Sequence, residues 1–206
     1  SKKQKEYLDM IYQSNLQMIK LVNNLLNISR LESGRIKIDP KPAQLENIIE
    51  DVVKKILPLA KEKKCKVVFV KPKNKLPIIP LDESLIRQVI TNLLANAINY
   101  SKTEKGEVSI KIGQNQREYL IEVSDNGIGI PSESQSKIFQ RFYRADNAKK
   151  INPNGNGMGL YLVKLIIEAA DGKIWFKSQE EQGTSFFVSI PLFGMKEKEG
   201  EKPLET

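Results

Sequence analysis

The chain has 206 residues, of which 40% are hydrophobic, so it is long enough for one or two domains with a sizeable core. No apolar run approaches the roughly 18 residues that span a membrane, and no signal peptide is apparent. The single cysteine, Cys65, excludes an internal disulfide and a cysteine-based metal site. The complete absence of histidine excludes imidazole catalysis, and no phosphohistidine can form within this chain.

The net charge is +8, which suits either an anionic partner or a lysine-rich solvated surface. The basic residues are scattered along the chain and form no arginine-rich stripe. No nucleic-acid motif accompanies them, so we expect no nucleic-acid partner.

Residues 5–32 are predicted to form one long helix, because apolar side chains recur at heptad spacing. Leu8 and Val22 occupy one heptad position, and Ile11, Met18 and Leu25 occupy a second. The alternatives are a helix that pairs with other helices and an amphipathic helix that lies on its own domain. Gly34 is placed like a helix C-cap, which favours a separate element.

The remaining pattern alternates between helical and strand periodicity. Helices are predicted at 44–61, 82–100 and 158–170, short helical turns within 131–156, and strands at 36–38, 66–70, 78–79, 107–112, 119–123, 173–177 and 184–190. This order predicts an α+β fold, a two-layer α/β sandwich with a mixed sheet packed on helices, preceded by one long N-terminal helix. The predicted units are residues 1–34, a domain at 35–193, and a charged, disordered tail at 194–206.

Two asparagines, Asn92 and Asn96, lie four residues apart and therefore share one face of the helix at 82–100. Asparagine is a poor helix former, so two of them beside a buried face need a reason. They could ligate a hard cation that also holds phosphates. They could equally be buried amides bonded to neighbouring backbone.

Asp125-Asn126-Gly127-Ile128-Gly129-Ile130 follows a predicted strand. Its carboxylate can accept a hydrogen bond from a ligand amine, and glycine lets backbone approach a ligand closely. Read alone, the segment could also be a plain turn.

A second glycine cluster, Gly155-Asn156-Gly157-Met158-Gly159-Leu160, opens directly into a helix. Free backbone N–H groups at a helix start favour an anion. A flexible linker capped by a helix is the alternative. No P-loop or dinucleotide fingerprint is present.

These segments, taken in order with Phe139-Gln140-Arg141-Phe142-Tyr143-Arg144, resemble the N, G1, F and G2 boxes of bacterial sensor histidine kinases. Residues 21–34 are similar to the end of that family's second dimerisation helix, and the resemblance covers about residues 5–192. The family's histidine-bearing helix precedes this one, so the resemblance implies a fragment of a longer cytoplasmic or membrane-bound sensor.

The resemblance also implies a role for each site residue. Asp125 would accept from the adenine amine, with Gly127, Gly129, Ile130 and Tyr100 beside the nucleotide. Asn96 would be the main Mg²⁺ ligand, supported by Asn92, and Arg144 and Arg141 would contact the γ-phosphate of ATP. The remaining phosphate-binding residues would be Gly155, Gly157, Met158, Gly159 and Leu160. Phe139 and Phe142 would be core residues that anchor a lid at 139–156.

The expected function is transfer of the γ-phosphoryl group of ATP to a histidine supplied from outside the chain. The partners implied are that histidine-bearing helix, a response-regulator receiver domain, and a second copy of the chain bound through residues 8–26. One rival is an ATP hydrolase of the same superfamily, in which a glutamate stands where Asn92 does; an amide cannot act as a general base. The other rival is a non-enzymatic, nucleotide-binding interaction module.

Overall fold

A five-stranded mixed sheet with helices on one face forms the body of the computed structural model, which describes residues 2–102 and 105–204. The strand order is β2-β4-β5-β7-β6. β2 (Cys65–Val70) pairs in parallel with β4 (Gly106–Gln114), and the other neighbours are antiparallel. The remaining strands are β5 (Glu118–Asp125), β6 (Lys173–Gln179) and β7 (Gly183–Pro191). The predicted two-layer fold is confirmed.

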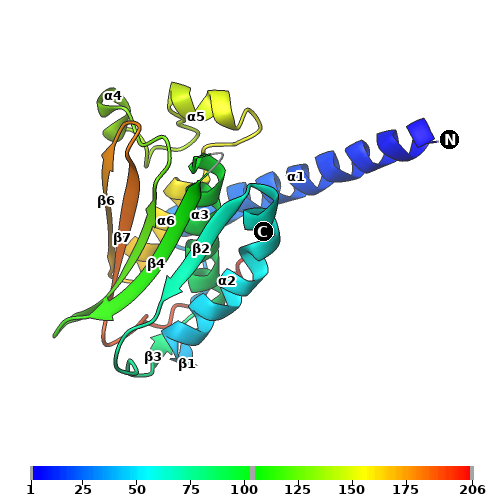
Figure 1. Cartoon of the computed structure of the whole chain (residues 1–206). Helices are drawn as coiled ribbons and strands as arrows, with labels where there is room; N and C mark the ends of the chain where they lie inside the picture. The colour runs from blue at the N-terminus through cyan, green and yellow to red at the C-terminus, as the bar shows by residue number, and fades with distance from the viewer. Residues whose placement is uncertain (1, 103–104, 205–206) are drawn as a thin grey trace.

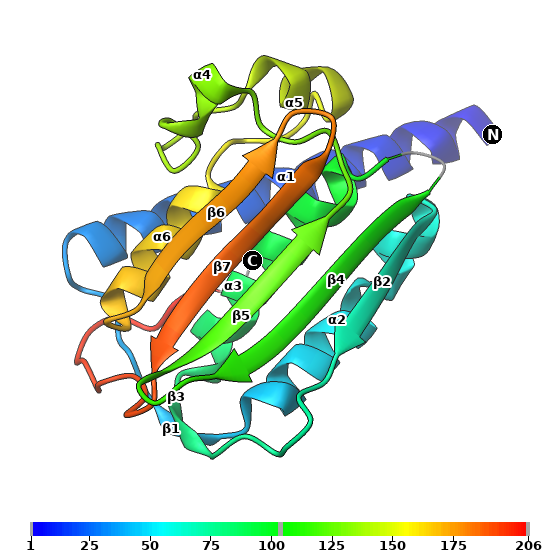
Figure 2. The ribbon, with the colours of Figure 1, turned by 60° about the vertical axis from the view of Figure 1, so that its left-hand side comes forward.

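Three helices cover one face of the sheet, and Figure 2 shows the sheet in front with the helices behind it. They are α2 (Leu45–Glu62), α3 (Glu83–Tyr100) and α6 (Gly159–Ala169). α3 lies between the other two and contacts β4 and β5. Asp82 caps α3, since its side chain accepts from the backbone N–H groups of Ser84 and Leu85. Pro58 lies inside α2, which continues past it for four residues.

The predicted strand at 36–38 is not part of the sheet. Ile36 and Ile38 instead form isolated bridges with Glu201 and Lys198. The second predicted short strand becomes β3 (Ile79–Leu81), which pairs with β1 (Lys41–Ala43) in a separate two-stranded sheet. Short helices α4 (Ser132–Gln135) and α5 (Asp146–Ile151) lie beyond one end of the main sheet (Figure 1).

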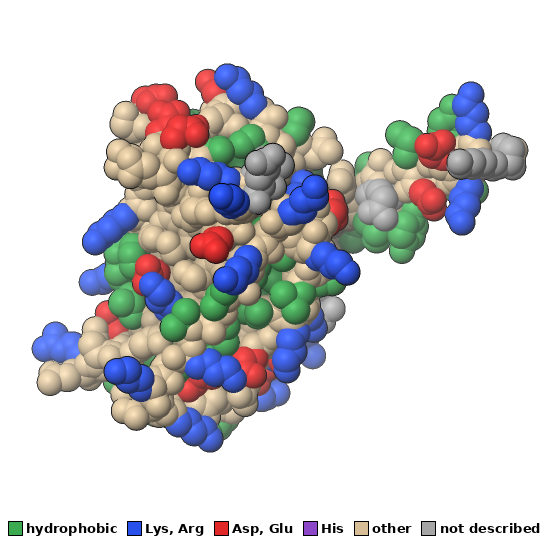
Figure 3. Space-filling model, in the orientation of Figure 1, with side chains coloured by type: hydrophobic (Ala, Val, Ile, Leu, Met, Phe, Trp, Pro, Cys, Tyr) green, Lys and Arg blue, Asp and Glu red, His purple; other side chains and the backbone are tan. Residues whose placement is uncertain are grey.

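The first helix, α1 (Lys2–Glu32), extends away from the body at its N-terminal end (Figure 1). Its C-terminal part packs on α6, where Asn24, Asn27 and Ile28 are buried. Figure 3 shows hydrophobic side chains on the projecting part of α1. The large hydrophobic residues exposed on this helix are Tyr7, Leu8, Met10, Ile11, Tyr12, Leu16, Met18, Ile19, Leu21, Val22 and Leu26.

The disordered tail expected at 194–206 is wrong for its described part, which packs against the domain. Met195 is 4% exposed, and its N–H donates to the carbonyl of Pro80 at 2.8 Å. The Asn27 side chain donates to the carbonyl of Leu204 at 2.7 Å and accepts from its N–H at 2.8 Å. The charged composition suggested disorder, but apolar and backbone anchors outweigh it. Residues 205–206 lie outside the described residues.

Replacing Met195 by alanine tests the packing of this segment. Met195→Ala removes a buried side chain and should lower the free energy of unfolding by about 2–4 kcal/mol. Glu199→Ala is the matched control, because Glu199 is exposed in the same segment. Urea unfolding of both variants decides the matter. Equal stabilities would contradict the packed arrangement.

Candidate nucleotide-binding site

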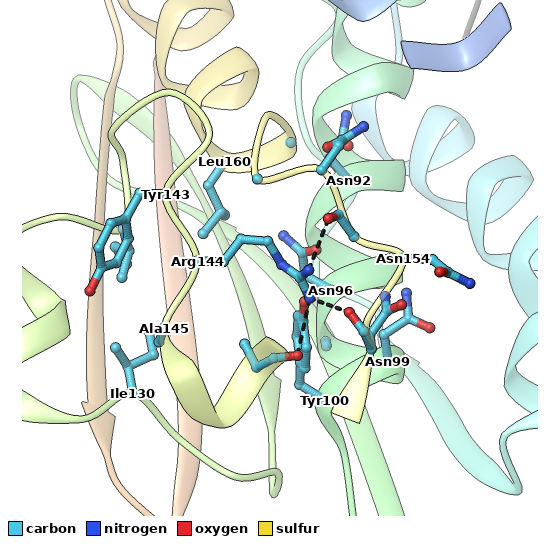
Figure 4. A pocket seen from close by; sticks show the side chains of 18 of the residues that line it. Asn92, Asn96, Asn99, Tyr100, Ile130, Tyr143, Arg144, Ala145, Asn154 and Leu160 are labelled. Atoms are coloured by element: carbon cyan, nitrogen blue, oxygen red, sulfur yellow. Dashed lines mark hydrogen bonds between the residues drawn. The ribbon is translucent and has the colours of Figure 1, made fainter. Parts of the chain in front are cut away.

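One cavity of about 620 Å³ brings together the separated motifs of the sequence. It lies among α1, α3, α5, the start of α6 and the loop after β5. Figure 4 shows Asn92, Asn96, Asn99 and Tyr100 along α3, with Arg144, Leu160 and Ile130 on the other side. The predicted site residues that line the cavity are Asn92, Asn96, Tyr100, Asp125, Gly129, Ile130, Arg144, Gly155, Gly157, Gly159 and Leu160.

Asp125 ends β5 and lines the cavity. Its Oδ1 accepts from the N–H of Gly127 at 2.8 Å and from the N–H of Thr184 at 3.3 Å. No group among the described residues donates to the second oxygen, Oδ2, which leaves Oδ2 available to a ligand amine. The sequence analysis did not assign this role to Thr184.

Burial raises the pKa of the Asp125 carboxyl from 3.8 to about 6. The two N–H donors, from Gly127 and Thr184, act in the opposite direction and offset only part of this effect. The carboxylate is therefore held in a site that disfavours its charge, and a donor on Oδ2 would stabilise the ionised form.

Gly127 and Gly129 are needed because the loop approaches the protein's own backbone. A Cβ at Gly127 would lie 2.1 Å from the carbonyl oxygen of Tyr100. One at Gly129 would lie 2.0 Å from the carbonyl oxygen of Gln179, and Gly129 also has φ +63°. Both glycines were expected to let backbone approach a ligand, and of the two Gly129 lines the cavity. Gly127 itself does not line the cavity.

Arg144 lines the cavity, but its guanidinium is bonded to backbone carbonyls. Nη1 donates to Pro153 at 3.1 Å and Gly155 at 2.9 Å, and Nη2 donates to Ala148 at 3.1 Å and also to Asn152. Figure 4 marks hydrogen bonds between Arg144 and other residues that line the cavity. In this conformation the guanidinium holds the loop after α5 together.

Arg141 does not line the cavity, contrary to the expectation that it contacts a phosphate. Its Nη1 lies 3.8 Å from Glu32 on α1, and its guanidinium lies over the Phe142 ring. Phe142 is 56% exposed and has φ +64°, so its predicted core role is wrong. Phe139 does pack edge-to-face on Phe176 and Phe186.

The second glycine cluster forms the start of α6. Met158 is fully buried beneath it and does not line the cavity. Gly157 has φ +69°, and a Cβ on it would lie 2.7 Å from the Phe142 backbone. A Cβ on Gly159 would lie 2.9 Å from Asn92 Oδ1. The cluster therefore lets α6 begin directly beside the asparagine pair of α3.

Asn92 and Asn96 could hold a divalent cation only together with further ligands. Asn92 Nδ2 donates to the Gln88 carbonyl at 2.9 Å, so its Oδ1 is turned toward Gly159. The side-chain amide of Asn96 forms no hydrogen bond within the described part of the chain. No group of three acidic, Cys or His residues that could hold a metal occurs among the residues described. Amide oxygens suit Mg²⁺, but phosphate oxygens or water would have to complete its shell.

Comparison with known proteins gives concordant findings. A family model described as histidine kinase-, DNA gyrase B- and HSP90-like ATPase matches residues 81–194. Sensor protein kinase WalK of Staphylococcus aureus is 34% identical over 189 residues, which is 90% of this chain and 44% of that protein. For WalK of strain JH9 the covered share is 30%. The chain thus spans less than half the length of these relatives.

Two solved structures share the fold. The catalytic domain of histidine kinase ThkA is 26% identical, with a TM-score of 0.64, over 75% of this chain and 98% of that one. Full-length ShkA in complex with AMPPNP is 24% identical, with a TM-score of 0.79, over 98% of this chain and 40% of that one. Separately, no helix in the described ranges is long and apolar enough to cross a membrane.

Adding a methyl group at Gly127 tests the close approach of this loop to α3. Gly127→Ala should lower the free energy of unfolding by about 3 kcal/mol, since backbone must move. Gly113→Ala is the control, because a Cβ there meets nothing within 4 Å. Denaturant titration measures both. A Gly127→Ala protein as stable as the control would refute the packing described.

The Asp125 pKa predicts a pH-dependent stability difference. Because the pKa is raised in the folded state, the folded protein binds this proton more tightly than the unfolded chain does. The protonated carboxyl therefore stabilises the fold at low pH, and this contribution is lost as pH rises from about 4 to about 6. Relative to Asp125→Asn, the wild type should lose on the order of 2 kcal/mol across this window. Urea unfolding from pH 4 to pH 8 checks the sign; a constant difference would contradict the raised pKa.

Proposed function

The chain belongs to the histidine kinase-, DNA gyrase B- and HSP90-like ATPase family, and on this basis we propose that it is the ATP-binding catalytic part of a two-component sensor histidine kinase. It binds Mg·ATP and transfers the γ-phosphoryl group to a histidine that another segment or chain supplies. The observation that carries the proposal is the single cavity that unites Asp125, Asn96 and the Gly155–Gly159 cluster.

Asp125 selects adenine in this proposal. Its Oδ1 is held by two backbone N–H groups, which fixes the orientation of the carboxylate and directs Oδ2 to the exocyclic amine of the base. Guanine presents a carbonyl at that position, and two acceptors facing each other are unfavourable. Tyr100 and Ile130 line the same end of the cavity.

Asn96, with Asn92 beside it, holds Mg²⁺ together with the phosphates. The metal supplies charge neutralisation on the transferred group. The protein mainly positions the nucleotide and excludes water, because phosphoryl transfer needs an aligned acceptor more than covalent help. Asn92 is an amide and cannot activate water as a base, which favours phosphotransfer over hydrolysis.

The remaining partners follow from the same proposal. A histidine-bearing helix and a response-regulator receiver domain act as the successive phosphoryl acceptors, in the cytoplasm. The exposed apolar face of α1 between residues 8 and 26 supports pairing with other helices, including those of a second copy. Arg144 reaches the γ-phosphate only if it releases the carbonyls that it holds here.

Phosphorylation in trans tests the proposal. We expect the chain with Mg·ATP to phosphorylate a supplied kinase helix that carries the acceptor histidine. The Asp125→Asn variant should lose measurable calorimetric binding of a non-hydrolysable ATP analogue and all transfer, while it keeps the fold. Tight ATP binding without a labelled acceptor would favour the non-enzymatic rival. Release of inorganic phosphate without acceptor would favour the hydrolase.

A further inference from the structure

The cavity holds few cations for a ligand as highly charged as a nucleoside triphosphate. Among the described residues that line it, Lys20 and Arg144 are the only cationic side chains. Each terminal nitrogen of the Arg144 guanidinium already donates to two backbone carbonyls. The terminal N–H groups of Arg144 are therefore committed, since each terminal nitrogen carries two protons.

Lys20 is not committed in this way. It is exposed at the rim of the cavity on α1, and its ammonium group forms no ion pair within the residues that the structure describes. Figure 4 shows α1, the blue ribbon, beyond Asn92 and away from Tyr100 and Ile130. This is the end of the cavity opposite the proposed base-recognition loop.

α1 presents a largely polar stripe to the cavity although it exposes many large hydrophobic side chains elsewhere along its length. Ser14, Gln17, Lys20 and Asn24 recur at spacings of three and four, so they lie on one side of the helix. Met18 and Leu21 flank them. A helix that met only other helices through this side would have no need of a lysine and amides there.

Asn24 adds a second, independent observation. It is 4% exposed, it lines the cavity, and its Oδ1 has no hydrogen-bond partner. A buried amide without partners is costly, so such groups are rare unless a ligand or water satisfies them. Because Oδ1 only accepts, its missing partner is a donor, and a water molecule ordered by the bound phosphates can supply one where a phosphate oxygen cannot.

We propose that α1 completes the nucleotide site: Lys20 neutralises charge on the terminal phosphates, and Asn24 Oδ1 accepts a hydrogen bond from water that these phosphates order. This inference rests on the proposed ATP-binding function and adds to it a wall contributed by the helical segment. It follows that the triphosphate binds more tightly when α1 lies against α6, and that a bound triphosphate in turn stabilises that position of α1.

The test compares ligands that share the base and differ in phosphate charge. Calorimetry gives the affinities of a non-hydrolysable ATP analogue and of adenosine for the wild type and four variants. Lys20→Gln should weaken the triphosphate about tenfold or more and leave adenosine unchanged. Lys20→Arg, which keeps the positive charge, should bind the triphosphate nearly as tightly as the wild type does. The difference between wild type and Lys20→Gln should shrink with added salt.

Lys5→Gln is the matched control, because it removes the same charge from the same helix about 22 Å farther along its axis. It should bind both ligands as the wild type does. Asn24→Ala should likewise reduce triphosphate affinity selectively, with circular dichroism confirming the fold.

If Lys20→Gln weakens triphosphate binding no more than Lys5→Gln does, this inference is overturned while the ATP site stands. If the wild type binds neither ligand, the proposed function itself fails and this inference fails with it.

Discussion

The segment from Asp125 to Ile130 is held between two pieces of backbone, and the site depends on that confinement. On one side the carbonyl of Tyr100, at the end of α3, accepts from the N–H of Ile128 at 3.0 Å. On the other side the turn between β6 and β7 lies against Gly129, and Glu181 donates to the carbonyl of Ile128 at 2.8 Å. A Cβ does not fit at either contact, so the loop can take this position only with glycine at 127 and 129.

This confinement fixes the direction of the Asp125 carboxylate. Oδ1 accepts from two backbone N–H groups, and Oδ2 has no donor within the described part of the chain. A carboxylate oriented by donors that belong to the fold loses little entropy when it binds a ligand. The same burial removes water from the carboxylate and so raises its pKa. A hydrogen-bond donor from a ligand would then stabilise the charged form.

Periodicity in the sequence predicted the helices at 45–62 and 83–100 and the antiparallel strands to within a few residues, because each has its own apolar pattern. The cavity-lining residues of α3 and of the loop after β5 could also be found, since polar residues in apolar surroundings mark them. Features that depend on distant contacts could not. Nothing local to Arg144 predicts four carbonyl acceptors, and nothing near Arg141 predicts Glu32. The segment after Gly194 reads as disordered until Ile36 and Ile38 are placed beside it.

That last segment ties the C-terminal end of α1 to the domain through several contacts. Glu201 and Lys198 bridge the chain that leaves the helix, Arg30 pairs with Glu201 at 2.9 Å, and Leu204 is bonded to Asn27. Glu32, the last residue of α1, accepts from the Tyr161 hydroxyl at 2.7 Å. These contacts anchor the C-terminal end of α1, while its N-terminal part projects away from the body. A displacement of the projecting part of α1 therefore acts on α6, which the anchored part contacts, and on the glycine cluster where α6 begins.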